Sequence, residues 1–494
     1  MNPSDPLPAL PIGVPQARSR TVRLGAVMAV ATALSGCASF SSDGGMNVAA
    51  GVASGELKKD TVAIRTVEDA ISARARVEYL LKRPLTADTA VQIALLNNRG
   101  LQAAYNELGI AEAMMVKATL PPNPSFSFSR ISGSLESELE ATIAADILAL
   151  ATMPARAEIA ADRFRAAQLR AAEETLRVAA DARRNYYKAV AAHELAAFLM
   201  QANAAAETAS KLARQLGETG AMNKLDQARN QVFYAEVTTQ LASARQRAFS
   251  ERERLIRSLG LWGGDHDFTF PNTLPALPSH PRTLPSVEQD AISRRVDLQI
   301  ARIELEALAK SYGLTNATRF VNLFQLSGIY KDTKESVGTE NVQFRDFGPG
   351  ATVEIPIFDF GEIRVHQAEQ TYMEAVNRLA EKAVNVRSEA RDAYRAYRSA
   401  YDIARQYQRE IIPLRKIISD ETLLRYNAML IDVFTLLEEA RRRIQETTAA
   451  IEAKRDFWIA KTDLQTAVVG GGEMRPADER SRLAITPESA TTGD

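Results

Sequence analysis

Residues able to perform acid–base, nucleophilic or metal chemistry are few in this chain, and they are not grouped. The histidines, His193, His266, His280 and His366, are scattered without the spacing of metal ligands. The triplet Asp265-His266-Asp267 offers cation-binding groups, but it lies in a Gly- and Pro-rich connector, where a solvated loop is the expected structure. Gly-rich phosphate loops, nucleophile elbows, zinc motifs and convergent carboxylate pairs are absent from the sequence. We therefore predict no catalytic residues, no metal site and no cofactor, and hence a protein that is not an enzyme.

The single cysteine, Cys37, is the one residue suited to a covalent modification. Three arginines between positions 18 and 23 precede an apolar segment at 24–34, which ends in Leu34-Ser35-Gly36-Cys37. This is the pattern of a secretory signal, and it resembles the bacterial lipobox, whose cysteine is acylated. A chain with one cysteine forms no internal disulfide, which favours lipid attachment over a buried thiol. In the lipoproteins that this pattern resembles, a residue other than Asp after the cysteine, here Ala38, implies passage to the outer membrane.

Composition narrows the class of protein further. Hydrophobic residues make up 46% of the chain and charged residues 24%, which is globular and not a disordered composition. The formal net charge of −1 gives no basic footprint for nucleic acid. After Cys37 no apolar run reaches the eighteen or so residues that a transmembrane helix needs. If the chain spans a membrane, it must do so with strands in a closed barrel.

A duplication is the strongest internal signal. The series Leu101-Gln102-x-Ala104-x-x-Glu107-Leu108 recurs as Leu298-Gln299-x-Ala301-x-x-Glu304-Leu305, at an offset of 197 residues (298 − 101 = 197). At the same offset Gln92 matches Gln289 and Ala94 matches Ala291. Self-similarity at so long a period indicates that a whole half of the protein was duplicated.

Each half opens with a helix and continues with two strands. The caps are Thr86 with Asp88 in the first half, and Ser286 with Gln289 as a capping box in the second; the helices run to about Lys117 and Tyr312. Apolar residues then alternate with small or polar ones over 125–129, 140–147, 320–330 and 350–355. Such two-faced strands suit the wall of a membrane barrel, and equally a soluble hairpin packed on helices.

A very long helical stretch follows each pair of strands, at 155–216 and 362–425. Both stretches are rich in Ala, Glu, Arg and Gln, and some sixty helical residues extend about 90 Å. The chain reverses at 217–226 and 426–434, and each return helix ends near Gly260 and Val468. Pro271, Pro275, Pro278, Pro281 and Pro285 exclude a continuous helix from the connector between the halves.

These residues together resemble the TolC family of outer-membrane efflux proteins over nearly all of the mature chain. The stretches that carry the resemblance are Leu85-Thr86-Ala87-Asp88-Thr89-Ala90-Val91 with Asn97-Asn98, Leu120-Pro121-Pro122-Asn123-Pro124, Leu259-Gly260-Leu261-Trp262-Gly263 and Ile355-Pro356-Ile357-Phe358-Asp359-Phe360-Gly361. The resemblance implies a mainly α fold with a membrane β-barrel portion. Three protomers would share a twelve-stranded β-barrel, which closes the sheet edges, and a trimeric α-helical periplasmic barrel.

The resemblance also implies roles for the two helix reversals, as periplasmic tips that dock an adaptor. In the first tip the resemblance points to Gly217, Gly220 and Asp226, and in the second tip to Tyr426 and Met429. Met429 replaces a glycine that is usual in the family, so we expect a different turn geometry or docking contact there. Family members often carry two acidic residues three positions apart just after the second tip. Here Thr435 and Glu438 occupy those positions, and Asp432, one turn earlier, is a candidate for the missing charge at a cation-attracting aperture. The alternative is that Asp432 and Glu438 are solvated helix charges paired with Arg441 and Arg442.

The resulting prediction is an outer-membrane channel, lipid-anchored, with its helical portion in the periplasm. Its expected partners are two further copies of itself, a periplasmic adaptor (membrane fusion) protein, an inner-membrane pump of the resistance-nodulation-division (RND) class and outer-membrane lipid, but not nucleic acid. Metal ions or small toxic compounds are the expected cargo. A periplasmic adaptor, a structural coiled-coil lipoprotein and the channel of a type I protein secretion system are the alternatives. The expected segments are the signal peptide (1–36), lipidated tail (37–83), first repeat (84–262), connector (263–285), second repeat (286–469) and flexible C-terminal tail (470–494).

Overall fold

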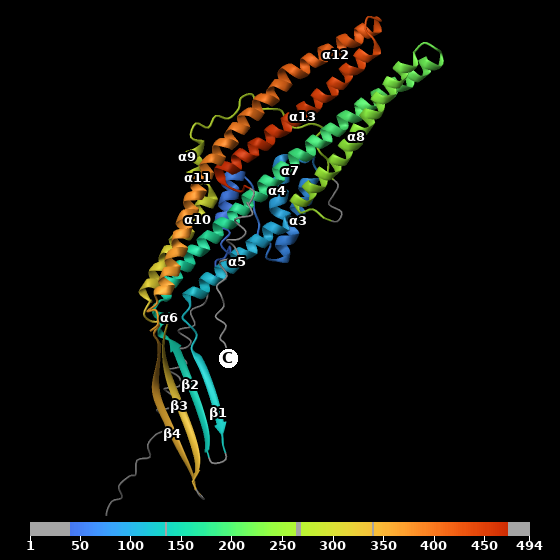
Figure 1. Ribbon diagram of the computed structural model, residues 1–494. Coiled ribbons are helices and arrows are strands. Elements are labelled where there is room, and N and C mark those ends of the chain that lie inside the picture. The colour runs from blue at the N-terminus through green and yellow to red at the C-terminus, as the bar shows by residue number, and fades with distance from the viewer. Residues whose placement is uncertain (1–39, 134–135, 263–267, 338–339, 473–494) are drawn as a thin grey trace, which may run out of the picture.

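The computed structural model describes residues 40–133, 136–262, 268–337 and 340–472. The molecule is elongated, with the strands at one end and two long helical hairpins extending to the other (Figure 1). Its helices are α2 (Asn47–Val52), α3 (Val67–Leu81), α4 (Ala87–Asn97), α5 (Arg99–Thr119), α6 (Ile147–Ala151), α7 (Met153–Glu218), α8 (Lys224–Leu259), α9 (Val287–Arg294), α10 (Val296–Ala317), α11 (Glu362–Gln406), α12 (Ile412–Asn427) and α13 (Val433–Val469), with π-helical turns η1 (Ala53–Leu57) and η2 (Tyr407–Ile411). Its strands are β1 (Ser125–Ser132), β2 (Glu136–Asp146), β3 (Leu323–Val337) and β4 (Glu340–Glu354).

Both halves contain the predicted series of elements, but the opening helix of each half is broken in two. Asn98 adopts an extended backbone between α4 and α5, and its side-chain oxygen accepts a hydrogen bond from the Leu101 amide at 3.1 Å. Arg295 breaks the second half at the equivalent place, between α9 and α10. The capping box expected at Ser286 was wrong: the Ser286 side chain makes no cap hydrogen bond, whereas Thr86 forms one with Thr89.

The four strands form one antiparallel sheet in the order β1-β2-β3-β4. Phe128 is opposite Ala141, Ala141 is opposite Tyr330, and Tyr330 is opposite Phe347, so these residues share one face. The neighbouring row, which begins at Ser129 and Glu140, is polar and faces the other way. The alternation predicted from the sequence is therefore confirmed within the strands, which extend further than expected towards the loops of the two hairpins, whereas Ile147, Phe320 and Ile355 lie outside them.

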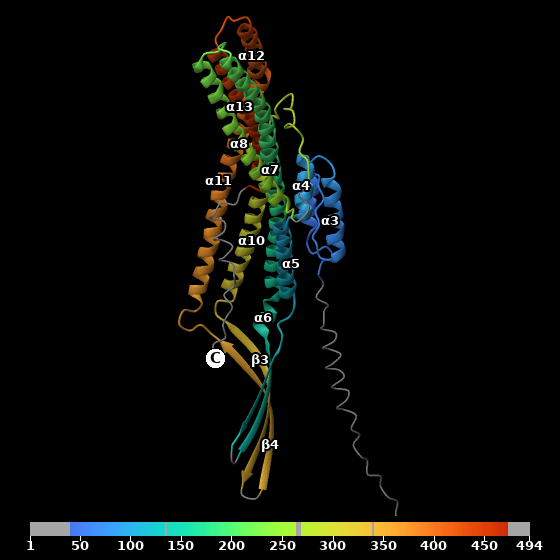
Figure 2. The ribbon, with the colours of Figure 1, turned by 90° about the vertical axis from the view of Figure 1, so that its right-hand side faces the viewer.

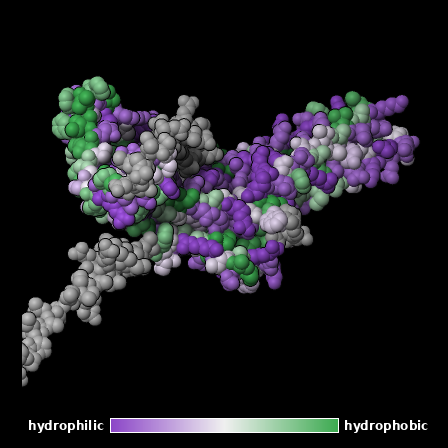
Figure 3. All heavy atoms as spheres, turned by 90° about the horizontal axis from the view of Figure 1, so that it is seen from below, coloured by the Kyte–Doolittle hydropathy of each residue, from purple (hydrophilic) through white to green (hydrophobic). Residues whose placement is uncertain are grey.

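The apolar face of the sheet is largely uncovered. The aromatic rings of Phe126, Phe128 and Phe347 are 76%, 72% and 81% exposed. Seen from the strand end, apolar side chains gather along one side of the molecule (Figure 3). No helix in the described ranges is long and apolar enough to cross a membrane.

The long helices pack through small residues. Helix α7 has 66 residues and extends about 100 Å. It packs on α4, α5, α8, α10 and α13 and buries many alanines, such as Ala172, Ala179 and Ala182, which let helix axes approach closely. The outgoing helix of the second hairpin is not uniform, because η2 and Pro413 interrupt it between α11 and α12. Figure 2 shows α3 and α4 on one flank of this helical shaft.

The described part of the connector, 268–285, has no helix or strand but is held against the shaft. The side chains of Phe268 and Leu274 are buried. The Trp458 indole donates a hydrogen bond to the Pro275 carbonyl at 3.1 Å, and the Tyr401 hydroxyl donates to the Ser279 carbonyl at 2.8 Å. The Leu274 amide donates to the carboxylate of Glu194 in α7 at 2.8 Å, so the connector contacts both long hairpins.

A charge cluster couples the two halves near the strand end. The carboxylate of Asp162 in α7 is buried, and it accepts hydrogen bonds from Lys310 of α10 (2.7 Å) and from Arg165. Burial alone would raise the pKa of Asp162, but the two cations more than offset this effect and hold its pKa below the usual range. The ionised carboxylate therefore stabilises the fold at neutral pH.

We expect Asp162→Asn to lower the thermal unfolding temperature at neutral pH. The pKa of Asp162 is lower in the folded state than in the unfolded state. Its contribution to the free energy of unfolding is therefore fully present above the unfolded pKa of about 4, and it is lost as the pH falls through the folded pKa. The variant should therefore lose less stability than the wild type on acidification below about pH 4. Glu158→Gln is the matched control, because Glu158 also contacts Lys310 but is exposed; an equal effect there would contradict the assignment.

Candidate functional site at the helical tips

The first tip is a tight turn between α7 and α8. Gly220 has a left-handed backbone (φ +79°), and the amide of Ala221 donates to the carbonyl of Leu216 at 2.8 Å. Asn223 then caps α8, with its side-chain oxygen accepting from the Asp226 amide at 2.8 Å. These hydrogen bonds are local to the turn and fix its shape.

The second tip repeats this turn at an offset of 209 residues (429 − 220 = 209). Met429 has a left-handed backbone (φ +58°), and the amide of Leu430 donates to the carbonyl of Arg425 at 2.9 Å. Asp432 caps α13 as Asn223 caps α8, accepting hydrogen bonds from the amide (3.0 Å) and the hydroxyl (2.6 Å) of Thr435. Met429 adopts the left-handed conformation that glycine favours, so the turn has the geometry of the first tip, and a different docking contact stays a prediction.

Met429 and Leu430 form the apex of the second tip. Their side chains are 93% and 74% exposed, whereas the first tip turns on Gly217 and Gly220. A left-handed backbone costs a residue with a side chain about 1 kcal/mol relative to glycine. The second tip thus presents two large apolar side chains on a mildly strained turn.

The candidate aperture residues are held by local contacts. The hydrogen bonds from Thr435 lower the pKa of Asp432, so Asp432 is ionised and engaged as a helix cap. Glu438 accepts a hydrogen bond from Arg441 at 2.8 Å, as the alternative interpretation predicted, whereas Arg442 forms no ion pair with Asp432 or Glu438 among the described residues. Within one protomer the structure brings Asp432 and Thr435 together and sets Glu438 one turn further along α13.

Contacts between the hairpins, which the sequence did not reveal, fix the relative position of the tips. Arg441 of α13 also donates to Glu236 of α8 at 2.9 Å. On the same two helices, the guanidinium of Arg229 lies 5.1 Å from the centre of the Phe434 ring. Because these partners are about two hundred positions apart in the chain, no local pattern could have paired them.

Comparison with known proteins supplies the family. Residues 287–468 match the family described as outer membrane efflux protein. A structure of CusC overlays with a TM-score of 0.64 at 17% identity, covering 78% of this chain and 92% of that one. The outer membrane channel CmeC of Campylobacter jejuni overlays with a TM-score of 0.63 at 17% identity, covering 80% and 88%. Residues 287–468 thus match the outer membrane efflux protein family, and the chain has the fold of these two solved structures.

A curated relative matches part of the chain at a higher sequence identity than these structures. The cobalt-zinc-cadmium resistance protein CzcC of Cupriavidus metallidurans is 24% identical over 300 residues, which are 58% of this chain and 66% of the relative. The matched stretch thus spans just under two thirds of that relative. The family matched by residues 287–468 and the fold of the solved structures are those that the sequence predicted.

The predicted site residues of the efflux protein fall into three groups. Gly217, Gly220 and Asp226 lie together at the first tip, and Tyr426 and Met429 lie together at the second. Asp432, Thr435 and Glu438 lie just behind the second tip on α13. Cys37, the predicted lipidation site, and the signal peptide before it lie outside the described residues.

We expect Met429→Gly to stabilise the second tip by about 0.5–1 kcal/mol, because glycine adopts the left-handed backbone without strain. Gly220→Ala at the equivalent position of the first tip should have the opposite sign and a similar size. Hydrogen–deuterium exchange of the tip amides measures both changes locally. Faster exchange at the second tip in Met429→Gly would contradict the strain.

Proposed function

We propose that three copies of this chain form the passive outer-membrane channel of a tripartite efflux system. The observation that carries the proposal is the four-stranded sheet at the end of the helical shaft. Its outer strands, β1 and β4, each pair with one neighbour only, and one of its faces bears exposed aromatic rings. Unpaired strand edges are not tolerated in lipid, so a membrane-spanning sheet of this kind needs further copies that close it into a barrel.

The shaft suits a conduit across the periplasm. Helix α7 alone extends about 100 Å away from the strand end, and both tips lie at its far end (Figures 1 and 2). The tips, at Gly217, Gly220, Asp226, Tyr426 and Met429, are the docking surfaces for a periplasmic adaptor. An inner-membrane pump of the RND class supplies the energy, since the sequence has no energy-coupling motif.

Metal ions or small toxic compounds are the proposed cargo. The support comes from the relative CzcC, whose name assigns it to cobalt, zinc and cadmium resistance. In the assembled trimer, Asp432 and Glu438 of each copy line a cation-attracting aperture behind the second tip. Both carboxylates accept hydrogen bonds within one protomer. They attract cations at the aperture only if the assembled trimer brings the three copies together around the axis.

A lipid anchor at Cys37 is compatible with the described start of the chain. The amide of Ser41 donates to the buried carboxylate of Glu112 at 2.6 Å, which fixes this point about 10 Å from the strand end of α5. The four steps from Cys37 to Ser41 span at most about 14 Å. This length allows Cys37 to reach the level of the strand end of α5, near the proposed membrane surface.

We expect the purified protein to run as a trimer in native mass spectrometry and to conduct ions in planar bilayers. A strain that lacks it should become sensitive to cobalt, zinc and cadmium, and Asp432→Asn with Glu438→Gln should restore resistance only in part. Sensitivity to dyes and antibiotics alone would replace metal cargo by organic cargo. A monomer without conductance would contradict the channel.

We expect Cys37→Ser to abolish incorporation of labelled palmitate and to remove the corresponding mass from the mature chain. The matched control is Ser41→Ala, which leaves the acceptor intact and should label normally. Labelling that persists in Cys37→Ser would exclude the anchor, while the channel measurements would be unaffected by either result.

A further inference from the structure

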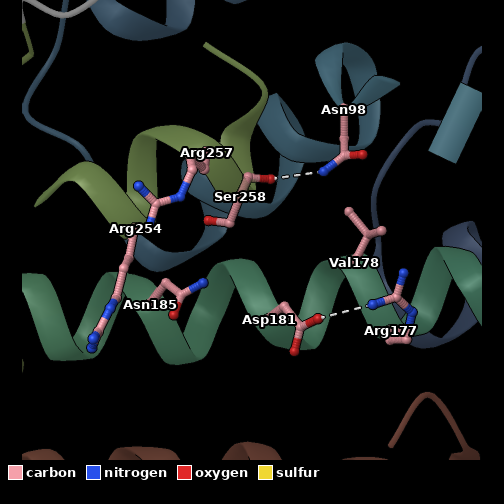
Figure 4. A pocket seen from close by; sticks show the side chains of 8 residues that line it. All are labelled: Asn98, Arg177, Val178, Asp181, Asn185, Arg254, Arg257 and Ser258. Atoms are coloured by element: carbon pink, nitrogen blue, oxygen red, sulfur yellow. Dashed lines mark hydrogen bonds and ion pairs between the residues drawn. The ribbon is translucent and has the colours of Figure 1, made fainter. Parts of the chain in front are cut away.

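A cleft lies between α7 and α8, roughly midway along the shaft. Its volume is about 410 Å³, and Asn98, at the break between α4 and α5, closes one side of it (Figure 4). Arg177 and Arg254 stand at opposite ends of the cleft, with Asp181 and Asn185 of α7 between them (Figure 4). A cavity of this size accommodates a small molecule or one group of a larger one.

The lining of this cleft is positively charged. Arg177, Arg254 and Arg257 contribute three guanidinium groups, and Asp181 is the one carboxylate among the described lining residues. Asp181 is itself shared, because it accepts from Arg177 at 3.4 Å and from Arg184 at 3.0 Å. Arg177 also pairs with Glu174, and Arg254 pairs with Glu251, so Arg257 is the guanidinium of the lining that has no carboxylate partner among the described residues.

Part of the hydrogen-bonding capacity of the cleft is unused. Arg254 donates to Glu251 at 2.7 Å through one nitrogen, which leaves the rest of its guanidinium available. Among the described residues, neither the side chain of Arg257 nor that of Asn185 has a hydrogen-bond or ion-pair partner. Planar guanidinium groups with free N–H donors are the usual ligands of carboxylate and phosphate oxygens.

A second cavity on the same helices is the useful contrast. It has a volume of about 250 Å³ and lies between α7, α8 and α13. Its two arginines are already paired with its anions, since Arg247 contacts Glu452 at 3.1 Å and Arg455 contacts Asp456 at 2.8 Å. The excess of positive charge is thus a property of the α7–α8 cleft and not of every cavity in the shaft.

We propose that the α7–α8 cleft binds an oxyanion, namely a carboxylate or phosphate group. Such a group would bridge Arg254 and Arg257 and accept a further hydrogen bond from Asn185. The cleft repels metal cations, so it is not part of a cation path. Arg177 is 24 residues from the first residue of α7, which places it about 36 Å from the strand end. The ligand therefore comes from the aqueous side. It is either a free anion or a group carried on a cell-envelope polymer.

The test is a titration of the full-length protein in detergent with inorganic phosphate and with succinate, followed by isothermal calorimetry. Potassium chloride at equal ionic strength corrects for screening. We expect saturable binding at one site per chain, weakened about tenfold or more by Arg257→Gln, the loss expected for a charge-assisted hydrogen bond. Arg245→Gln is the matched control, because Arg245 is also exposed on α8 but lies outside the cleft.

A second arm separates the sources of the anion. The protein is sedimented with isolated peptidoglycan, which carries carboxylates, with and without competing phosphate. If the protein sediments with peptidoglycan, and if both Arg257→Gln and added phosphate prevent this, the ligand is a group carried on the polymer. If the protein binds phosphate but does not sediment with peptidoglycan, the ligand is a free anion. The proposal is overturned if neither arm detects binding, or if Arg257→Gln and Arg245→Gln weaken binding equally. Conductance in bilayers tests the channel separately, so the two failures are distinguishable.

Discussion

The hydrogen bonds that the outer sheet edges lack determine how the rest of the molecule is organised. The outer edges of β1 and β4 have N–H and C=O groups without a strand partner, and in water these groups would bind solvent. The exposed aromatic face suits lipid, where no solvent is available to these groups. One chain is therefore an incomplete unit. The rigid shaft, the charge cluster at Asp162 and the pinned connector all hold the two strand pairs of one chain in a single sheet, ready for neighbours.

Features that follow from a local repeating pattern of residue types were predictable from the sequence. The two faces of the strands follow a period of two, and the long helices follow from runs of good helix formers, so both agree with the structure. The duplication also predicted the order of elements in each half. Its offset changes from 197 residues in the opening helices to 209 at the tips, because the β3–β4 hairpin is longer than the β1–β2 hairpin.

Features that depend on tertiary context were not predictable. Ser286 has the sequence of a capping box, but its backbone does not adopt the extended conformation of a cap, whereas Thr86 does. The breaks at Asn98 and Arg295 carry no proline or glycine at the break itself. At the tips, resemblance to a family supplied the positions, but the link from Arg441 to Glu236 joins residues from different halves. The left-handed backbone of Met429 likewise appears only in the structure, since methionine gives no local signal for it.

The interruption at η2 makes the two hairpins mechanically unequal. In α7 each backbone carbonyl along 66 residues takes part in one regular ladder, so bending stress is spread over the whole rod. In the second hairpin the wide turn at Tyr407–Ile411 and the missing donor of Pro413 remove part of that ladder at a single level. A sideways load applied to both tips would therefore flex the second hairpin at one joint, while the first would deflect as a stiff beam.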